Sequence, residues 1–128
     1  MFASSVAGRL DRHNFADRLV QANGGSWPDM EGLIRDLYVA HARPGDTMLD
    51  VGVNHGGHFI QMGEAVGEAG QVVGFEAAPE LARRTMATVD LHYSHLRPRL
   101  TLHQCAVSNE PGEATFYFSK ANDSGLRA

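Results

Sequence analysis

The sequence predicts an α/β fold in which a parallel β-sheet packs against helices. Short apolar runs alternate with amphipathic segments, and glycine or proline follows most of them. The order of the segments is strand, helix, strand, helix, strand, which is typical of an open α/β sheet. Strands connected in this way run parallel, and their crossover connections are expected to be right-handed.

Two helices are expected before the first strand. Residues 1–22 carry apolar side chains four and five positions apart, and residues 23–25 (Asn-Gly-Gly) end this helix, because both residue types tolerate a left-handed backbone. The second helix begins near Asp29 and ends before Pro44, because proline disfavours helical geometry in the residue that precedes it. Residues 1–43 are therefore predicted to form an amino-terminal helical segment.

Four later segments have the composition of strands, and they span residues 47–53, 71–77, 99–107 and 114–119. The first is apolar on both faces apart from Asp50, which predicts a strand covered by helices on both sides. The third alternates between apolar and polar residues and is expected at the outer edge of the sheet. Helices are expected over residues 57–68 and 80–93, between the strands.

The length and composition indicate what class of protein this is. The 128 residues amount to one domain or a large piece of one, and 43% of them are hydrophobic, so a packed core is expected. A net charge of −4 without a basic run argues against nucleic acid or an anionic membrane as the main partner. No apolar run reaches the roughly 20 residues needed to cross a bilayer. The single cysteine, Cys105, fits a reducing compartment, so the sequence predicts a soluble cytoplasmic protein of undefined oligomeric state.

The residues with the clearest chemistry form a loop, Asp50 to Gly57 (DVGVNHGG), between the first strand and the following helix. Glycine is needed in such a loop because a side chain would block a close approach of the backbone to a ligand. The loop and the helix N-terminus can then present backbone N–H groups to a carboxylate or a phosphate. A second feature is Glu76, which ends the next strand 24 residues after Gly52 and could accept hydrogen bonds from ribose hydroxyls.

The loop departs from a dinucleotide-binding fingerprint. Asn54 stands where the fingerprint needs its second glycine, although Gly57 matches the third. A carboxylate at Asp50 would repel a pyrophosphate but would favour a ligand that carries an amino group. S-adenosylmethionine has such an ammonium group, together with a carboxylate and a ribose.

Three stretches of the chain resemble the FkbM-type S-adenosylmethionine-dependent methyltransferases over residues 44–125. They are PGDTMLDVGVNHG, GFEAAPE and LHQCAVSNEPGEATFYFS. The resemblance implies a Rossmann-like methyltransferase sheet with flanking helices, incomplete at its C-terminus because the family fold has seven strands. Residues 44–128 would then be the amino-terminal part of the methyltransferase domain of a longer enzyme.

The resemblance also implies a cofactor site. Its residues are Asp50, Gly52, Val53, Asn54, Gly56, Glu76, Ala77 and Ala106. Asp50 and Gly52 would lie beside the methionine end of the cofactor, Glu76 would hold the ribose, and Ala106 would approach the adenine. Val53 and Ala77 depart from the alanine and the proline that are usual in the family, and the second change affects the turn that aims Glu76.

The expected activity is transfer of the sulfonium methyl group to a hydroxyl oxygen of a sugar or another small molecule. No residue in the sequence is identified as a catalytic base. His55 and His58 lie close to the loop, but no carboxylate at ligand spacing accompanies them, so no metal site is predicted. Two alternatives stay open: an NAD-dependent oxidoreductase, suggested by Gly52, Gly57 and Glu76, and a non-catalytic cofactor-binding fragment.

Overall fold

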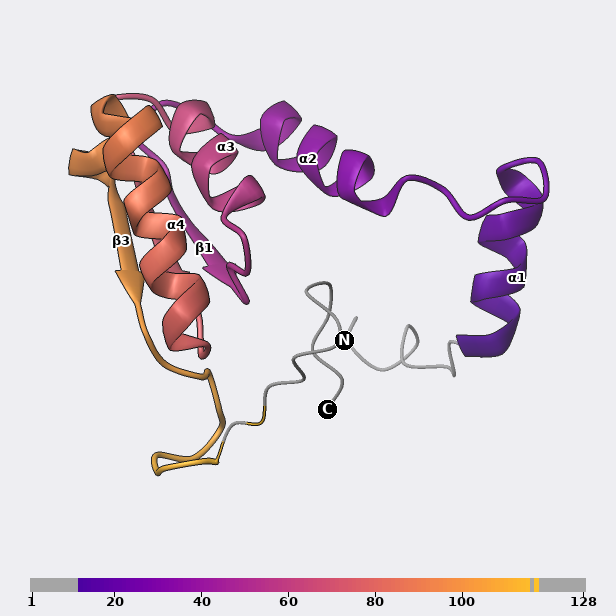
Figure 1. Ribbon diagram of the computed structural model, residues 1–128. Helices are drawn as coiled ribbons and strands as arrows, with labels where there is room; N and C mark the ends of the chain where they lie inside the picture. The colour runs from indigo at the N-terminus through magenta and orange to yellow at the C-terminus, as the bar shows by residue number, and fades with distance from the viewer. Residues whose placement is uncertain (1–11, 116, 118–128) are drawn as a thin grey trace, which may run out of the picture. The chain divides into compact units, whose positions relative to one another are not determined.

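The computed structural model describes residues 12–115 and 117. The chain divides into two compact units, residues 1–40 and residues 41–128 (Figure 1). The first unit contains helix α1 and nearly all of helix α2, and the second contains the β-sheet and the helices that follow it. None of the helices in the described residues has both the length and the apolar composition that crossing a membrane requires.

Helix α1 (Arg12–Ala22) lies within the predicted helix over residues 1–22, of which residues 1–11 fall outside the described part of the chain. Two glycines end the helix as predicted. Gly24 and Gly25 have φ values of 69° and 92°, and the N–H of Gly25 donates to the carbonyl of Val20 at 2.8 Å. The left-handed backbone at these positions turns the chain out of the helix.

Helix α2 (Met30–His41) begins at a side-chain cap. The carboxylate of Asp29 accepts a hydrogen bond of 3.0 Å from the N–H of Gly32, which would otherwise lack a partner in the first turn. After the helix the chain turns: the carboxylate of Asp46 accepts from the N–H of Arg43 at 2.8 Å, and the N–H of Asp46 donates back to the carbonyl of Arg43 at 3.0 Å. This turn leads directly into the first strand.

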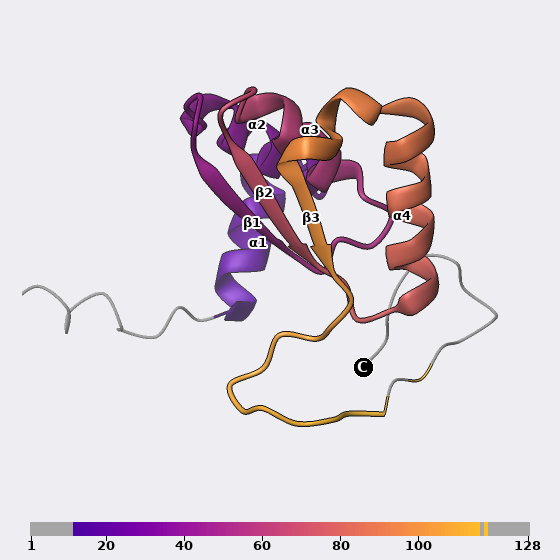
Figure 2. The same cartoon turned by 90° about the vertical axis from the view of Figure 1, so that its left-hand side faces the viewer.

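The sheet of the second unit has three parallel strands in the order β1, β2, β3 (Figure 2). Strand β1 (Thr47–Val51) pairs with β2 (Gln71–Phe75), and β2 pairs with β3 (Leu100–His103). Helix α3 (Gly57–Ala65) connects the first pair, while helix α4 (Pro79–His92) and a 3₁₀ helix, η1 (Ser94–Arg99), connect the second. The predicted order of strands and helices is therefore confirmed, and β3 lies at an edge of the described sheet as expected.

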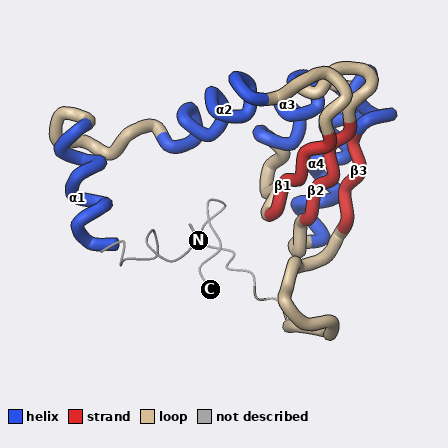
Figure 3. Tube along the Cα trace, turned by 180° about the vertical axis from the view of Figure 1, so that it is seen from behind, coloured by secondary structure: helices blue, strands red, loops and turns tan. Residues whose placement is uncertain are grey.

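The prediction that the first strand is buried on both faces is wrong for the described structure. Leu49 and Val51 are each 64% exposed, whereas Met48 and Asp50 point to the opposite face and are half-buried. Both α3 and α4 lie on that opposite face, and Figure 3 shows the three strands with these helices behind them. The strands advance across the sheet in one direction, so two crossovers of the same hand place both helices on one side.

The core lies between the sheet and its helices. Its largest fully buried side chains include Phe59 of α3, Val89 of α4 and Leu100 of β3. Gly74 of β2 allows this close packing, because a Cβ at that position would lie 2.7 Å from both the ring of Phe59 and the side chain of Val53. Val53 belongs to the loop after β1, so the packing beneath Gly74 also anchors that loop.

Several boundaries differ from the predictions. Strands β1 and β2 end at Val51 and Phe75, two residues before the predicted ends at residues 53 and 77. Helix α3 ends at Ala65 rather than at the predicted residue 68, and Gly67, with φ 69°, follows it in the left-handed conformation. The third strand covers only residues 100–103 of the predicted 99–107. Of the predicted strand over residues 114–119, residues 114, 115 and 117 are described and belong to no strand, and the others lie outside the described residues.

Candidate functional site

The glycine loop and Glu76 follow adjacent strands and meet at the same edge of the sheet. Gly52 comes directly after β1 and Glu76 directly after β2, and parallel pairing brings both strand ends together. The N–H groups of Gly52 and Val53 donate to the carbonyl of Phe75 at 2.8 and 3.2 Å. These bonds continue the strand pairing into the loop, and they hold the start of the loop against the end of β2.

The carboxylate of Glu76 connects the glycine loop to the segment between β2 and α4. Oε2 accepts a hydrogen bond of 2.7 Å from the N–H of Asn54 in the glycine loop, and Oε1 accepts one of 2.8 Å from the N–H of Ala78 before α4. Only 2% of the residue is exposed. A carboxylate has about four acceptor positions, so each oxygen keeps one for a further donor. The sequence predicted the proximity of Glu76 to the loop, but it did not predict that backbone N–H groups occupy both oxygens.

Asp50 lies on the helix-covered face of β1, one residue before the strand ends. Its Oδ2 atom is buried and has no hydrogen-bond partner among the described residues. Burial raises the pKa of Asp50, the neighbouring His58 acts in the opposite direction, and the charge of Glu76 adds to the rise. An unpaired carboxylate oxygen beside a glycine loop is suited to a cationic partner.

Three residues give the loop its shape through left-handed backbone conformations. Gly52, Asn54 and Gly56 have φ values of 86°, 53° and 84°. A Cβ at Gly52 would have no atom within 4 Å, so the space above it is open. A Cβ at Gly56 would lie 2.6 Å from the Cγ2 atom of Thr85, so only glycine fits there. Gly56 is also the N-cap of α3, and no side chain caps this helix end.

The remaining predicted site residues differ in burial and in their place relative to the loop. Val53 is buried at 5% exposure and anchors the loop, and Ala77 is half-buried between Glu76 and α4. Ala106 is exposed and follows β3 by three residues, which places it in the chain that leaves the same edge of the sheet. The structure thus gathers the loop, Glu76 and Ala77 at one edge, while Ala106 belongs to the segment after the third strand.

The sequence analysis missed one residue of this arrangement, Thr85 of helix α4. Its hydroxyl donates a hydrogen bond of 3.0 Å to the carbonyl of Asn54, and the residue is 1% exposed. A signal for it was present in the sequence, because Ala82, Thr85 and Val89 share the buried face of the helix. A threonine on an otherwise apolar helix face needs a hydrogen-bond partner, and here that partner is the loop.

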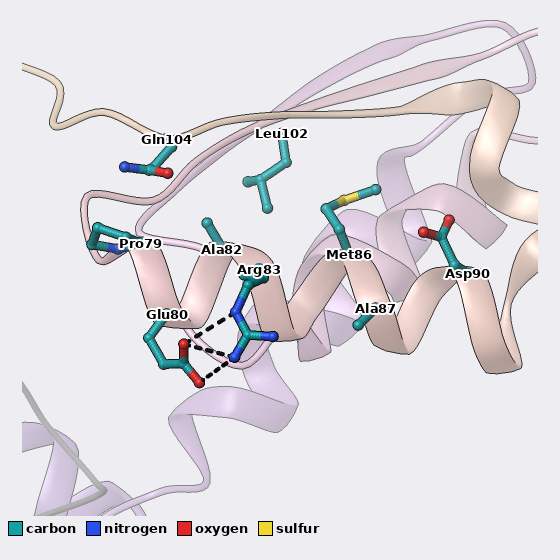
Figure 4. Close-up of a pocket in the computed structure, with 9 residues that line it drawn as sticks. All are labelled: Pro79, Glu80, Ala82, Arg83, Met86, Ala87, Asp90, Leu102 and Gln104. Carbon is teal, nitrogen blue, oxygen red and sulfur yellow. Dashed lines mark hydrogen bonds and ion pairs between the residues drawn. The ribbon is translucent and has the colours of Figure 1, made fainter.

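A groove of about 800 Å³ lies elsewhere, between α4 and the segment formed by β3 and Gln104. Figure 4 shows Met86 of α4 and Leu102 of β3 along it, with Glu80 and Arg83 paired at one end. A hydrogen bond from Arg83, which is 2.8 Å away, lowers the pKa of Glu80. None of the predicted site residues lines this groove, so the loop site and the groove are separate features.

The described residues contain no group of three or more histidine, cysteine, aspartate or glutamate side chains that could hold a metal ion. His55 and His58 each have an interaction partner within the structure.

The fold is that of the S-adenosylmethionine-dependent methyltransferases, represented by the part of the Rossmann-like sheet from β1 to β3. One similar structure is a candidate rRNA-methylase from Clostridium thermocellum, with a TM-score of 0.57 and 23% identity over 63% of this chain and 44% of that one. Another is an S-adenosylmethionine-dependent O-methyltransferase from Thermotoga maritima, with a TM-score of 0.51 and 24% identity over 62% of this chain and 28% of that one.

The chain therefore spans less than half the length of these solved structures. A comparison with protein-family models gives no match, and neither does a comparison with curated proteins. The similarity identifies the fold, while the FkbM-type assignment and the exclusion of a nucleic-acid partner stay predictions from the sequence.

Proposed function

We propose that this chain binds S-adenosylmethionine at the loop after β1 and takes part in methyl transfer to a small-molecule hydroxyl. The observation that carries the proposal is the hydrogen bond of 2.7 Å between the N–H of Asn54 and Glu76, which ties the glycine loop to the acid that follows the next strand. A glycine loop and an acid placed in this way form a binding site for a nucleoside at the carboxyl ends of parallel strands.

Each part of the cofactor has a chemically matched group in this proposal. The unpaired carboxylate oxygen of Asp50 receives the ammonium group, and the uncapped N-terminus of α3 at Gly56 receives the carboxylate. The free acceptor positions of Glu76 receive the ribose hydroxyls. Ala77 and Ala106 follow β2 and β3 and would border the adenine, with small side chains that leave space for a ring.

S-adenosylmethionine supplies a methyl group on a sulfonium, which is already a good leaving group. The protein then contributes mainly by positioning the two reactants in line and by excluding water. Among the described residues we assign none as a catalytic base. FkbM-type O-methylation of a sugar or another small molecule is the form of the activity that we propose for the whole protein, in a cytoplasmic setting.

An NAD-dependent oxidoreductase is the less favoured alternative. Its pyrophosphate would approach the loop where the Asp50 carboxylate lies, and a second negative charge at that place is unfavourable. Asn54 also occupies the position of the second fingerprint glycine. A chain that binds the cofactor without catalysing methyl transfer has the same site, so only an activity assay distinguishes it.

The proposal is tested by titration calorimetry on the full 128-residue chain with three ligands: S-adenosylhomocysteine, 5′-methylthioadenosine and NAD. We expect S-adenosylhomocysteine to bind most tightly, because only it offers both the amino-acid part and the adenosine. 5′-Methylthioadenosine, which lacks the amino-acid part, should bind more weakly, and NAD should bind least. Tighter binding of NAD than of S-adenosylhomocysteine would refute the proposal.

Glu76→Gln provides the matching variant. Its amide nitrogen would face one of the two backbone N–H donors, so we expect the affinity for S-adenosylhomocysteine to fall by about 1–3 kcal/mol. Glu80→Gln is the control, because Glu80 is an exposed carboxylate that pairs with Arg83 on the surface of α4. Thermal melts of both variants separate a loss of folding from a loss of binding. An affinity unchanged in folded Glu76→Gln would remove Glu76 from the site.

A further inference from the structure

Asn54 has a backbone conformation that needs support. Among the described residues it is the only one other than glycine with a positive φ, at 53°. A left-handed conformation costs an L-residue about 1–2 kcal/mol, although asparagine is among the residues that tolerate it best. The surrounding structure must therefore fix this conformation.

Two buried side chains fix the backbone of Asn54 from different elements. Glu76, after β2, accepts a hydrogen bond from the N–H of Asn54 at 2.7 Å, and Thr85, on α4, donates one to its carbonyl at 3.0 Å. Among the residues whose burial is described, these two are the buried polar ones, at 2% and 1% exposure. Both backbone polar groups of a single loop residue are thus bound by side chains that come from outside the loop.

The contact with Thr85 also determines where the next peptide group points. The carbonyl of Asn54 and the N–H of His55 belong to one planar trans peptide unit, in which they point in opposite directions. Because the hydroxyl of Thr85 draws the carbonyl towards α4, the N–H of His55 is directed away from α4. The methyl carbon of Thr85 would be only 2.6 Å from a Cβ at Gly56, so the same side chain limits the position of the N-cap of α3.

We propose that Thr85 is a positioning residue of the cofactor loop, which acts through the carbonyl of Asn54 to hold the loop in its binding-competent conformation. This inference rests on the function proposed above. The hydroxyl of Thr85 carries the effect, because the carbonyl of Asn54 needs a donor that an apolar side chain of the same shape cannot supply. If the competent conformation becomes less populated, the apparent affinity falls by the same factor.

The experiment compares three variants of the full chain. Thr85→Val keeps the shape and removes the hydroxyl, whereas Thr85→Ser keeps the hydroxyl and removes the methyl group. Thr88→Val is the matched control, since the hydroxyl of Thr88 on the same helix donates to the carbonyl of Arg84 at 3.0 Å, within α4 and not to the loop. The measurements are titration calorimetry with S-adenosylhomocysteine and amide hydrogen exchange of Asn54 and His55 by NMR.

We expect Thr85→Val to weaken binding of S-adenosylhomocysteine about fivefold or more, the factor that corresponds to the loss of one ordinary hydrogen bond. The amides of Asn54 and His55 should exchange faster in this variant. Thr85→Ser should retain the affinity and the exchange rates of the unmodified chain to within about twofold, and Thr88→Val should do the same. Rescue by serine would attribute the effect to the hydroxyl.

Equal affinity and equal exchange in Thr85→Val and the unmodified chain would overturn the inference. So would an equal loss in Thr85→Ser and Thr85→Val, because packing of the methyl group would then be responsible. If Thr85→Val does not fold, the serine variant still decides, since a loss of affinity in folded Thr85→Ser contradicts a role for the hydroxyl. If the unmodified chain does not bind S-adenosylhomocysteine, the proposed function fails, and unchanged amide exchange in the variants would separately refute loop positioning.

Discussion

Asp50→Asn should increase stability and decrease cofactor affinity in the same molecule. The carboxylate of Asp50 has a buried oxygen without a hydrogen-bond partner among the described residues, and burial raises its pKa. Asparagine has nearly the same shape and no charge, so it removes the cost of burying an ion. It also removes the group that we propose as the partner of the cofactor ammonium.

The expected gain in stability is at the low end of the range for an unsatisfied buried polar group. Such a group costs about 1–3 kcal/mol, and because Asp50 is only half-buried we expect about 1 kcal/mol. For an ordered unit of this size, that gain raises the melting temperature by about 4 °C or more. The interaction of Asp50 with His58 favours the charged form and reduces the gain.

The gain should depend on pH in a defined direction. Because the pKa of Asp50 is raised in the folded state, folding favours the protonated form, and the unmodified chain loses stability as pH rises through the interval between the ordinary aspartate pKa and the raised one. The variant lacks this titration. Its advantage should therefore be larger at pH 7 than in acid, and it should disappear well below the ordinary aspartate pKa of about 3.9.

The expected loss of affinity concerns only ligands that carry the ammonium group. A hydrogen bond to a charged partner contributes about 1.5–3 kcal/mol, so the Kd of S-adenosylhomocysteine should rise about 10- to 100-fold. 5′-Methylthioadenosine has no amino-acid part, and its Kd should stay the same. This contrast distinguishes the loss of one interaction from a general distortion of the loop.

Urea unfolding at pH 7 and pH 3, with calorimetric titration of both ligands at pH 7, measures these effects. Asp36→Asn is the control, because Asp36 is an exposed carboxylate on α2 whose side chain is 71% exposed. The reasoning is refuted if Asp50→Asn is less stable than the unmodified chain at pH 7. It is also refuted if the variant binds S-adenosylhomocysteine with undiminished affinity.

The other predictions concern two glycines. Gly74→Ala should lower the free energy of unfolding by about 1–3 kcal/mol, because its Cβ would lie 2.7 Å from Phe59 and from Val53. Urea unfolding measures this loss. Gly57→Ala is the control and should change the stability little, because no atom lies within 4 Å of its new Cβ. Equal stability of the two variants would contradict the described packing. Gly52→Val should lower the free energy of unfolding by about 1–2 kcal/mol, because residue 52 has a φ of 86°. It should also abolish binding of S-adenosylhomocysteine in calorimetry, because the valine side chain would fill the open space above the loop. Retained binding would mean that the ligand does not approach the loop at Gly52.

The sequence by itself determined the order and type of the elements. Apolar runs bounded by glycine and proline are local signals, so they located β1, β2 and β3, the four α-helices and the turn before Thr47 without knowledge of the packing. The sequence also predicted that Gly52 and Glu76, which follow two different strands, lie close together. Parallel pairing of consecutive strands makes their carboxyl ends neighbours, whatever the details of the connecting helix.

Tertiary structure decided what each polar group contacts. The covering of one face of β1 and the exposure of Leu49 depend on where α3 and α4 pack, which a strand pattern does not contain. The two N–H groups bound by Glu76 and the carbonyl bound by Thr85 belong to residues 22, 2 and 31 positions away, and hydrogen bonds of this kind leave no periodic trace in a sequence. Local patterns fix the backbone path of an element, whereas the partners of a buried polar side chain are fixed only when separate elements come together.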